Sequence, residues 1–99
     1  MAIDWREALA NSSVAIVSMD HDFYGSTGEE VLTEAIRLRI KILMLTNGLH
    51  VRIPQPFADY RGTKHLVLDE DYGDEAERVL RAWGVAQGAT AYDYEWEQR

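Results

Sequence analysis

The chain has 99 residues, of which 17 are acidic and 10 basic, and its formal net charge is −7. This charge opposes binding to DNA, to RNA and to anionic membrane surfaces, so no nucleic acid and no membrane is expected as a partner. The absence of cysteine excludes disulfides, thiolate zinc ligands and thiol nucleophiles. A chain of this length fits one domain, so residues 1–99 are expected to share a single core.

The start of the chain and its apolar runs predict a cytoplasmic protein. The first seven residues carry neither the basic nor the apolar segment of a secretory signal. The longest apolar run, residues 40–45, is interrupted by Lys41 and is far too short to span a bilayer. A chain without cysteine is also typical of a reducing compartment.

The first elements in chain order are predicted to be a short helix and a buried strand. Asp4 and Glu7 have the spacing of a helix-start pattern, which predicts a helix over residues 4–11. Residues 13–18 form a β-branched run that is too short for a helix, so a strand is expected there.

A second helix and a second strand are predicted next. Ser26 or Thr27 can cap the helix, because a glutamate lies three residues beyond each of them. This helix is expected to reach about Arg39. Residues 40–46 then predict a strand, which ends at an Asn-Gly turn.

The second half of the chain predicts a loop, a strand, a helix and a final strand. Residues 49–63 contain two prolines and no sustained period, so a long loop is expected. Residues 64–69 predict a third strand. A third helix is expected from Asp74 to a terminating Gly84. Alternating polar and aromatic residues over 89–96 predict an edge strand.

This order of elements predicts a small three-layer α/β fold. The sheet is expected to be open and mostly parallel, with three to four strands and about three helices. The apolar positions of these elements define the expected core. The residues predicted to be largely buried are Val14, Ile16, Leu32, Ala35, Ile42, Met44, Leu66, Leu68, Val79, Leu80 and Trp83.

Ligands of such folds bind at the carboxyl ends of the strands, which directs attention to residues 19–30. Glycines before a helix can present N–H groups to a phosphate, but Glu29 and Glu30 in the first turn oppose an anion there. Asp20 and Asp22 flank a histidine, but successive side chains of an extended segment point to alternate sides. These acids are interpreted as solvated loop residues, and no metal site is expected.

Two roles stay open for the glutamates of this segment. Glu29 or Glu30 can cap the helix, or one of them can attack or stabilise the sugar carbon of an N-glycoside.

The chain resembles two families in this region. The segments Ala10–Ser18, Tyr24-Gly-Ser26, Glu30–Ala35 and Ile40–Leu45, followed by His65–Asp69, are similar to the C-terminal two-thirds of a Toll/interleukin-1 receptor (TIR) domain. Residues 4–47 also resemble nucleoside 2-deoxyribosyltransferases, whose Gly-Thr-x-x-Glu signature is approximated by Gly25-Ser-Thr-Gly-Glu29.

The resemblance implies a flavodoxin-like or Rossmann-like fold with an essential glutamate at the start of the second helix. Glu30 is the TIR-type residue and Glu29 the transferase-type one. TIR enzymes that cleave NAD usually carry a tryptophan where this chain has Ser26. The first strand of both families has no counterpart before Asp4, which favours a binding or interaction module over a complete enzyme.

Two alternative functions stay open. One is an N-glycosidic-bond enzyme that acts on NAD or a nucleoside without a further cofactor, with Glu30 or Glu29 as the catalytic carboxylate. The ligand-binding residues implied for it are Asp20, Asp22, Tyr24 and Ser26. The other is an acidic decoy that binds the basic surface of a protein.

The missing first strand also predicts a homodimer. Without it, the strand over residues 14–18 has an open edge that natural proteins cover or pair. The short connection after Gly84 is expected to place the tail strand beside residues 64–69 instead. Pairing with a second copy is therefore the predicted cover.

Overall fold

A computed structural model describes residues 5–19, 24–46, 52–68, 72–84 and 91–93. In chain order the described elements are α1 (Trp5–Ala10), β1 (Val14–Met19), α2 (Thr27–Leu38), β2 (Lys41–Thr46), α3 (Gln55–Asp59), β3 (Lys64–Leu68), α4 (Tyr72–Ala82) and β4 (Ala91–Asp93). None of the described helices has the length and the apolar content needed to cross a membrane.

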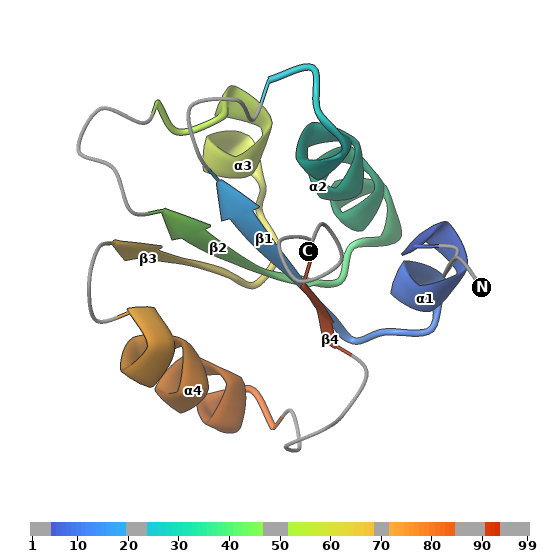
Figure 1. The fold of residues 1–99 in the computed structure, drawn as a ribbon. Helices are drawn as coiled ribbons and strands as arrows, with labels where there is room; N and C mark the ends of the chain where they lie inside the picture. The colour runs from blue at the N-terminus through green and yellow to red at the C-terminus, as the bar shows by residue number, and fades with distance from the viewer. Residues whose placement is uncertain (1–4, 20–23, 47–51, 69–71, 85–90, 94–99) are drawn as a thin grey trace.

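The strands form one parallel sheet in the order β3-β2-β1-β4 (Figure 1). β1 and β2 pair over their full length, from Val14 opposite Lys41 to Met19 opposite Thr46. β3 continues the sheet beyond β2, and β4 pairs with the first half of β1. The prediction of a small α/β fold with an open, mostly parallel sheet of three to four strands is confirmed.

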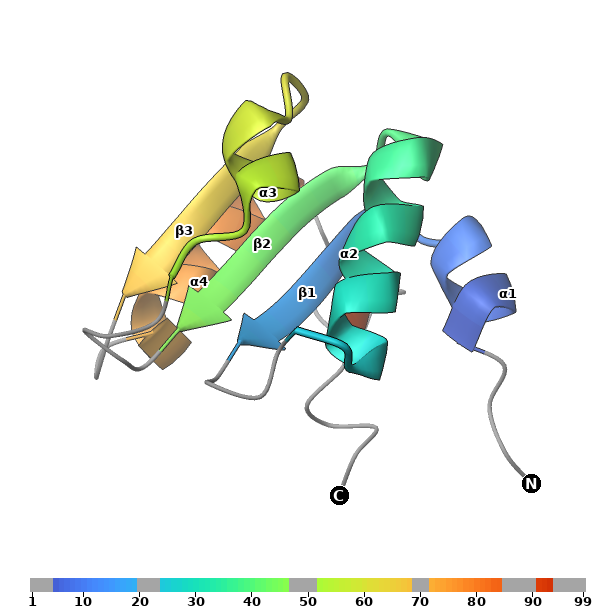
Figure 2. The ribbon, with the colours of Figure 1, turned by 90° about the horizontal axis from the view of Figure 1, so that it is seen from above.

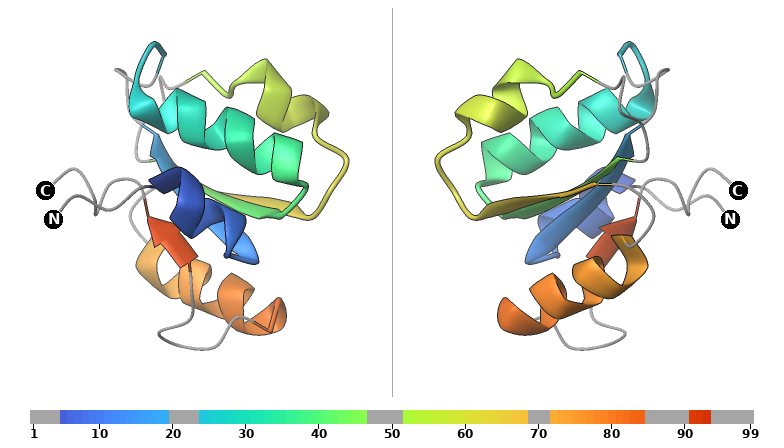
Figure 3. Two further views of the ribbon diagram at one scale, coloured as in Figure 1. Left: turned by 90° about the vertical axis from the view of Figure 1, so that its right-hand side faces the viewer. Right: turned by 90° about the vertical axis from the view of Figure 1, so that its left-hand side faces the viewer.

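Helices cover both faces of this sheet. α2 and α3 lie over one face and α4 over the other (Figures 1 and 2). α1 packs beside α2, next to the β4 edge of the sheet (Figure 3). The three layers follow from the single-sided apolar stripes of the helices, which must be buried against the sheet.

The strands bury side chains on both faces, which divides the core into two clusters. Along β2, Ile42 and Met44 join the cluster under α2, whereas Leu43 and Leu45 join the cluster over α4. This alternation is the period of two that a pleated strand imposes. Both clusters draw on β2, so this strand is the centre of the fold.

Five of the eleven residues predicted to be largely buried are buried, and five more are partly buried. Val14, Leu32, Ala35, Ile42 and Met44 are buried, which confirms those predictions. Ile16, Leu66, Val79, Leu80 and Trp83 are partly buried and pack against the two clusters.

The prediction for Leu68 is wrong, because its side chain is 61% exposed. Val67, its neighbour on the strand, is fully buried under α4. Leu68 therefore points to the opposite face. There the packing of edge strand β3 against the α2 cluster reaches Leu66 and leaves the last residue of the strand uncovered.

The predicted loop over residues 49–63 contains a helix, so that prediction is wrong over α3. The loop was expected because of two prolines, but these prolines start the helix. Pro54 is the N-cap with φ of −62°, and Pro56 lies in the first turn. Phe57 is 4% exposed and anchors the helix in the core. Lys64 Nζ donates to the carbonyls of Phe57 and Ala58 and so satisfies the carboxyl end of α3.

The predicted position of the tail strand is also wrong. β4 lies beside β1, with Ala91 opposite Val14 and Asp93 opposite Ile16, and not beside β3. The apolar edge of β1 gains a partner from the same chain, which a strand beside β3 would not supply. The open edge that motivated the homodimer is therefore paired over these residues, and the homodimer stays a prediction without that support.

Replacing Tyr60 by phenylalanine is expected to lower the free energy of unfolding by about 1–2 kcal/mol, because the Tyr60 hydroxyl donates to the Ile40 carbonyl at 2.7 Å. Burial also raises the pKa of this phenol, so the fold favours its neutral form. The wild type should lose stability as the pH rises above the ordinary tyrosine value of about 10, and Tyr60→Phe should lack this loss. Urea unfolding at several pH values measures both effects.

Tyr24→Phe is the matched control. The Tyr24 ring is exposed and its hydroxyl lies 3.4 Å from the Arg52 carbonyl, so the expected change is below about 0.5 kcal/mol. Equal effects of the two substitutions would contradict a structural role for the Tyr60 hydroxyl.

Candidate functional site

The start of α2 positions the glutamates that the sequence singles out. Gly25 has φ of 80°, a conformation open to glycine, and it turns the chain toward the helix. Ser26 is the N-cap residue in an extended conformation, but its side chain makes no capping hydrogen bond. The Gly25 N–H instead donates to Glu29 Oε1 at 3.1 Å. Glu29 therefore serves the helix start, as the capping interpretation predicts.

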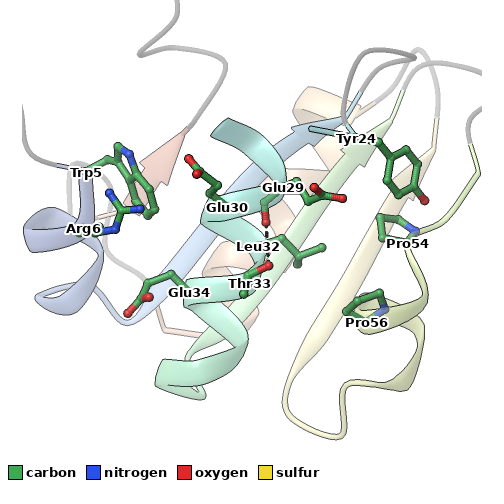
Figure 4. A pocket seen from close by; sticks show the side chains of 10 residues that line it. All are labelled: Trp5, Arg6, Tyr24, Glu29, Glu30, Leu32, Thr33, Glu34, Pro54 and Pro56. Carbon is green, nitrogen blue, oxygen red and sulfur yellow. Dashed lines mark hydrogen bonds between the residues drawn. The ribbon is translucent and has the colours of Figure 1, made fainter. Parts of the chain in front are cut away.

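The first turns of α2 also form the floor of a surface hollow of about 310 Å³, here called the α2 groove (Figure 4). Three glutamates of α2, at positions 29, 30 and 34, line it. Trp5 and Arg6 of α1 form one wall. Tyr24, Pro54 and Pro56 form the opposite wall.

The charged groups of the α2 groove differ in the ring contacts, hydrogen bonds and ion pairs that they make. The Arg6 guanidinium stacks over the Trp5 ring at 4.2 Å. Glu34 accepts hydrogen bonds from Arg37, which hold the pKa of the Glu34 carboxyl below its usual range, with a smaller contribution from the charge of Arg6. Glu30 is exposed, and its carboxylate makes no hydrogen bond or ion pair with any residue that the structure describes.

The structure brings together some of the predicted site residues and separates others. Tyr24, Glu29 and Glu30 line the same groove. In Figure 4 Glu30 projects toward the Trp5 and Arg6 wall, and Glu29 projects toward Tyr24. Ser26 is the helix cap and does not line the groove. Asp20 and Asp22 lie outside the described residues.

Sequence reasoning did not find the two walls of the groove. Trp5 falls within the predicted helix over residues 4–11, and residues 52–56 fall within the predicted loop, with no site assigned to either. Nothing in the spacing along the chain relates Trp5 to Pro54, since these residues line opposite walls of one groove only because α1 and α3 flank α2. The cationic and aromatic character of the α1 wall was visible as the pair Trp5-Arg6, but its position was not.

The side chains that line the groove can bind a ligand through their charge and through aromatic surface. Across residues 5–19, 24–46, 52–68, 72–84 and 91–93, no three histidine, aspartate or glutamate side chains are grouped closely enough to hold a metal ion. Glu30 is exposed to solvent, whereas Glu29 and Glu34 are half-buried. Such a site suits docking of a charged group more than a reaction that requires water to be excluded.

The fold and the groove define a small parallel α/β domain with an acidic surface site. The chain matches no protein-family model, no curated protein and no solved structure.

Proposed function

We propose that this domain is a binding module that docks a cationic side chain of a protein partner in the α2 groove. The observation that supports it most directly is the position of Glu30. Its carboxylate is exposed, has no partner among the described residues and projects into a groove with an aromatic wall on each side. An arginine or lysine side chain can pair with this carboxylate while its stem or guanidinium plane lies on a ring.

The balance of charge in the groove favours a cation. Of the three carboxylates that line it, Glu34 is paired with Arg37, and the other two face a single guanidinium of the lining, that of Arg6, which is stacked on Trp5. The net charge of −7 adds a field that attracts basic surfaces and speeds their association. This proposal joins the expected interaction module with the expected binding to a basic protein surface.

The architecture proposed for the module is TIR-like or deoxyribosyltransferase-like, in the wider Rossmann-like group. Its support is the strand order β3-β2-β1-β4, which is the order with which the Rossmann sheet begins. This order speaks for the wider Rossmann-like group and not for either family within it.

Glu30→Gln is expected to weaken binding of a tetra-arginine peptide about two- to fivefold, because an exposed ion pair contributes about 0.2–1 kcal/mol. Isothermal titration of the full chain at low ionic strength measures the change. Glu77→Gln is the matched control, since Glu77 is an exposed residue of α4 on the other face of the sheet and its loss changes the net charge equally.

A weakening by Glu77→Gln as large as that by Glu30→Gln would show that only net charge attracts the peptide. A tetra-lysine peptide that binds as tightly as tetra-arginine would leave the groove intact as the site but remove the contribution of ring stacking.

An N-glycosidic-bond enzyme is the second candidate, and one contact favours Glu30 over Glu29 as its carboxylate. Glu29 Oε1 is engaged by the Gly25 N–H, whereas the Glu30 carboxylate is available. The same variants test it: turnover of NAD or of nucleosides by the wild type, lost in Glu30→Gln and kept in Glu77→Gln, would replace the binding module by the enzyme.

A further inference from the structure

A second surface hollow lies at the other end of α2. It has a volume of about 670 Å³ and is bordered by Ile36 of the last turn of α2, by the C-cap residue Arg39, and by Tyr60, Arg61 and Gly62 after α3. We call it the Arg39–Arg61 pocket. It shares Pro56 with the α2 groove but carries the opposite dominant charge, because two guanidinium groups line it.

The positive charge of the pocket is only partly offset by the described chain, because two arginines and one aspartate line it. Arg39 and Arg61 make no ion pair with any described residue. The single acidic residue of the lining, Asp59, accepts a hydrogen bond from Gln55 Nε2 at 2.8 Å. Arg61 and Gly62 are exposed residues, and no hydrogen bond from their backbone N–H groups to another described residue is present.

Arg39 occupies its position at a conformational cost. Its φ is 59°, in the left-handed region, and its N–H closes the end of α2 on the Ile36 carbonyl while the Ile40 N–H bonds the Ala35 carbonyl. This is the position of a helix end where glycine is the common residue. An arginine there gives up backbone stability and gains a guanidinium at the pocket, and such strained residues cluster at functional sites.

The opposite wall of the pocket is held rigidly. The Tyr60 hydroxyl bonds the Ile40 carbonyl at 2.7 Å, which ties the end of α3 to the start of β2. A Cβ atom added at Gly62 would lie 2.4 Å from the Tyr60 hydroxyl oxygen, so only glycine lets the chain pass so close to the ring. The charge of Arg39 also opposes the rise that burial causes in the pKa of Tyr60, which is consistent with a guanidinium close to the phenol.

We infer that the Arg39–Arg61 pocket binds the phosphate group of a small molecule. Guanidinium groups pair with phosphate oxygens through charge-assisted hydrogen bonds, often bidentate. Ile36 and Pro56 supply apolar surface for an organic part of the ligand. The acidic net charge of the chain does not prevent this, because at physiological ionic strength charges beyond about 8 Å are largely screened and the two local guanidinium groups dominate.

Thermal unfolding of the full chain with inorganic phosphate and with phenyl phosphate tests this inference, against sodium chloride at matched ionic strength. A ligand at tenfold its dissociation constant is expected to raise the melting temperature by about 5–10 °C for a domain of this size. Equal responses to the two probes would indicate free phosphate as the ligand, and a stronger response to phenyl phosphate would indicate a phosphomonoester. No rise above the chloride control with either probe overturns the inference.

Three variants locate the site. Arg39→Gly should melt at or above the wild-type temperature, because glycine relieves the left-handed strain, and yet should lose the response to phosphate. Arg61→Gln should lose most of the response, and Arg81→Gln, which removes an exposed cation of α4, should keep it. A full phosphate response in Arg39→Gly overturns the inference, and the higher stability of this variant excludes unfolding as the cause of a loss.

Discussion

Replacing Leu43 by alanine is expected to lower the free energy of unfolding by about 2–5 kcal/mol. Leu43 is fully buried in the middle of β2, where it joins Leu45 and Val67 under α4. Strands pair on both sides of β2, so the sheet cannot close around the cavity that the substitution leaves. A domain of this size has a total stability of about 5–15 kcal/mol, so this one change removes a large share of it.

Leu68→Ala is the matched control, since it makes the same chemical change in the neighbouring strand. The Leu68 side chain is 61% exposed, and the expected loss stays within about 0.5 kcal/mol. Urea unfolding followed by circular dichroism measures both variants. A loss for Leu68→Ala that equals the loss for Leu43→Ala would mean that the exposed end of β3 is covered in solution, by residues outside the described part of the chain or by a second molecule.

Ending the chain at Thr90 is expected to produce the second large effect. This deletion removes β4 and exposes the N–H and C=O groups of β1 between Val14 and Ile16, which pair with Ala91–Asp93 in the full chain. An uncovered apolar strand edge favours pairing with other molecules. The shortened protein should be less stable to urea, and its mass by light scattering at micromolar concentration should rise above that of the full chain.

A chain that ends at Asp93 is the control for this deletion, because it keeps β4 and removes only residues 94–99. Its mass and its stability should match those of the full chain more closely than those of the chain ending at Thr90. If both shortened chains behave alike, β4 contributes little to the cover of β1. A full chain with twice the expected mass would restore the predicted homodimer, which must then form through a surface other than this edge of β1.

Local sequence patterns were sufficient to predict most elements of the fold. The β-branched run of β1, the capped apolar stripe of α2 and the glycine after α4 each express their conformational preference within a few residues. The apolar run of β2 likewise predicted a strand with Ile42 and Met44 in the core, and the same run also buries Leu43 and Leu45 on the other face. α3 was missed because its five residues contain one apolar anchor, Phe57, and no period can be recognised in so short a helix.

The assignment of the two candidate glutamates needed the structure. From the sequence alone, Glu29 and Glu30 lie at the start of α2, and each of them can either cap the helix or act as the catalytic carboxylate. Helical geometry turns adjacent residues about 100° apart, and this turn directs Glu29 to the Gly25 N–H and Tyr24 while Glu30 faces α1. Only the packing of α1 beside α2 decided that Glu30 faces the aromatic ring of Trp5.

The formation of β4 could be predicted from the sequence, but its position in the sheet could not. The alternating aromatic tail determined that a strand forms there, because that pattern suits a half-exposed strand. It could not determine which edge the strand joins, since hydrogen-bonding groups of the backbone are alike at every edge. The choice of β1 over β3, and the gathering of Arg39 and Arg61 at one pocket, depend on contacts between segments far apart in the chain, which only the tertiary structure brings together.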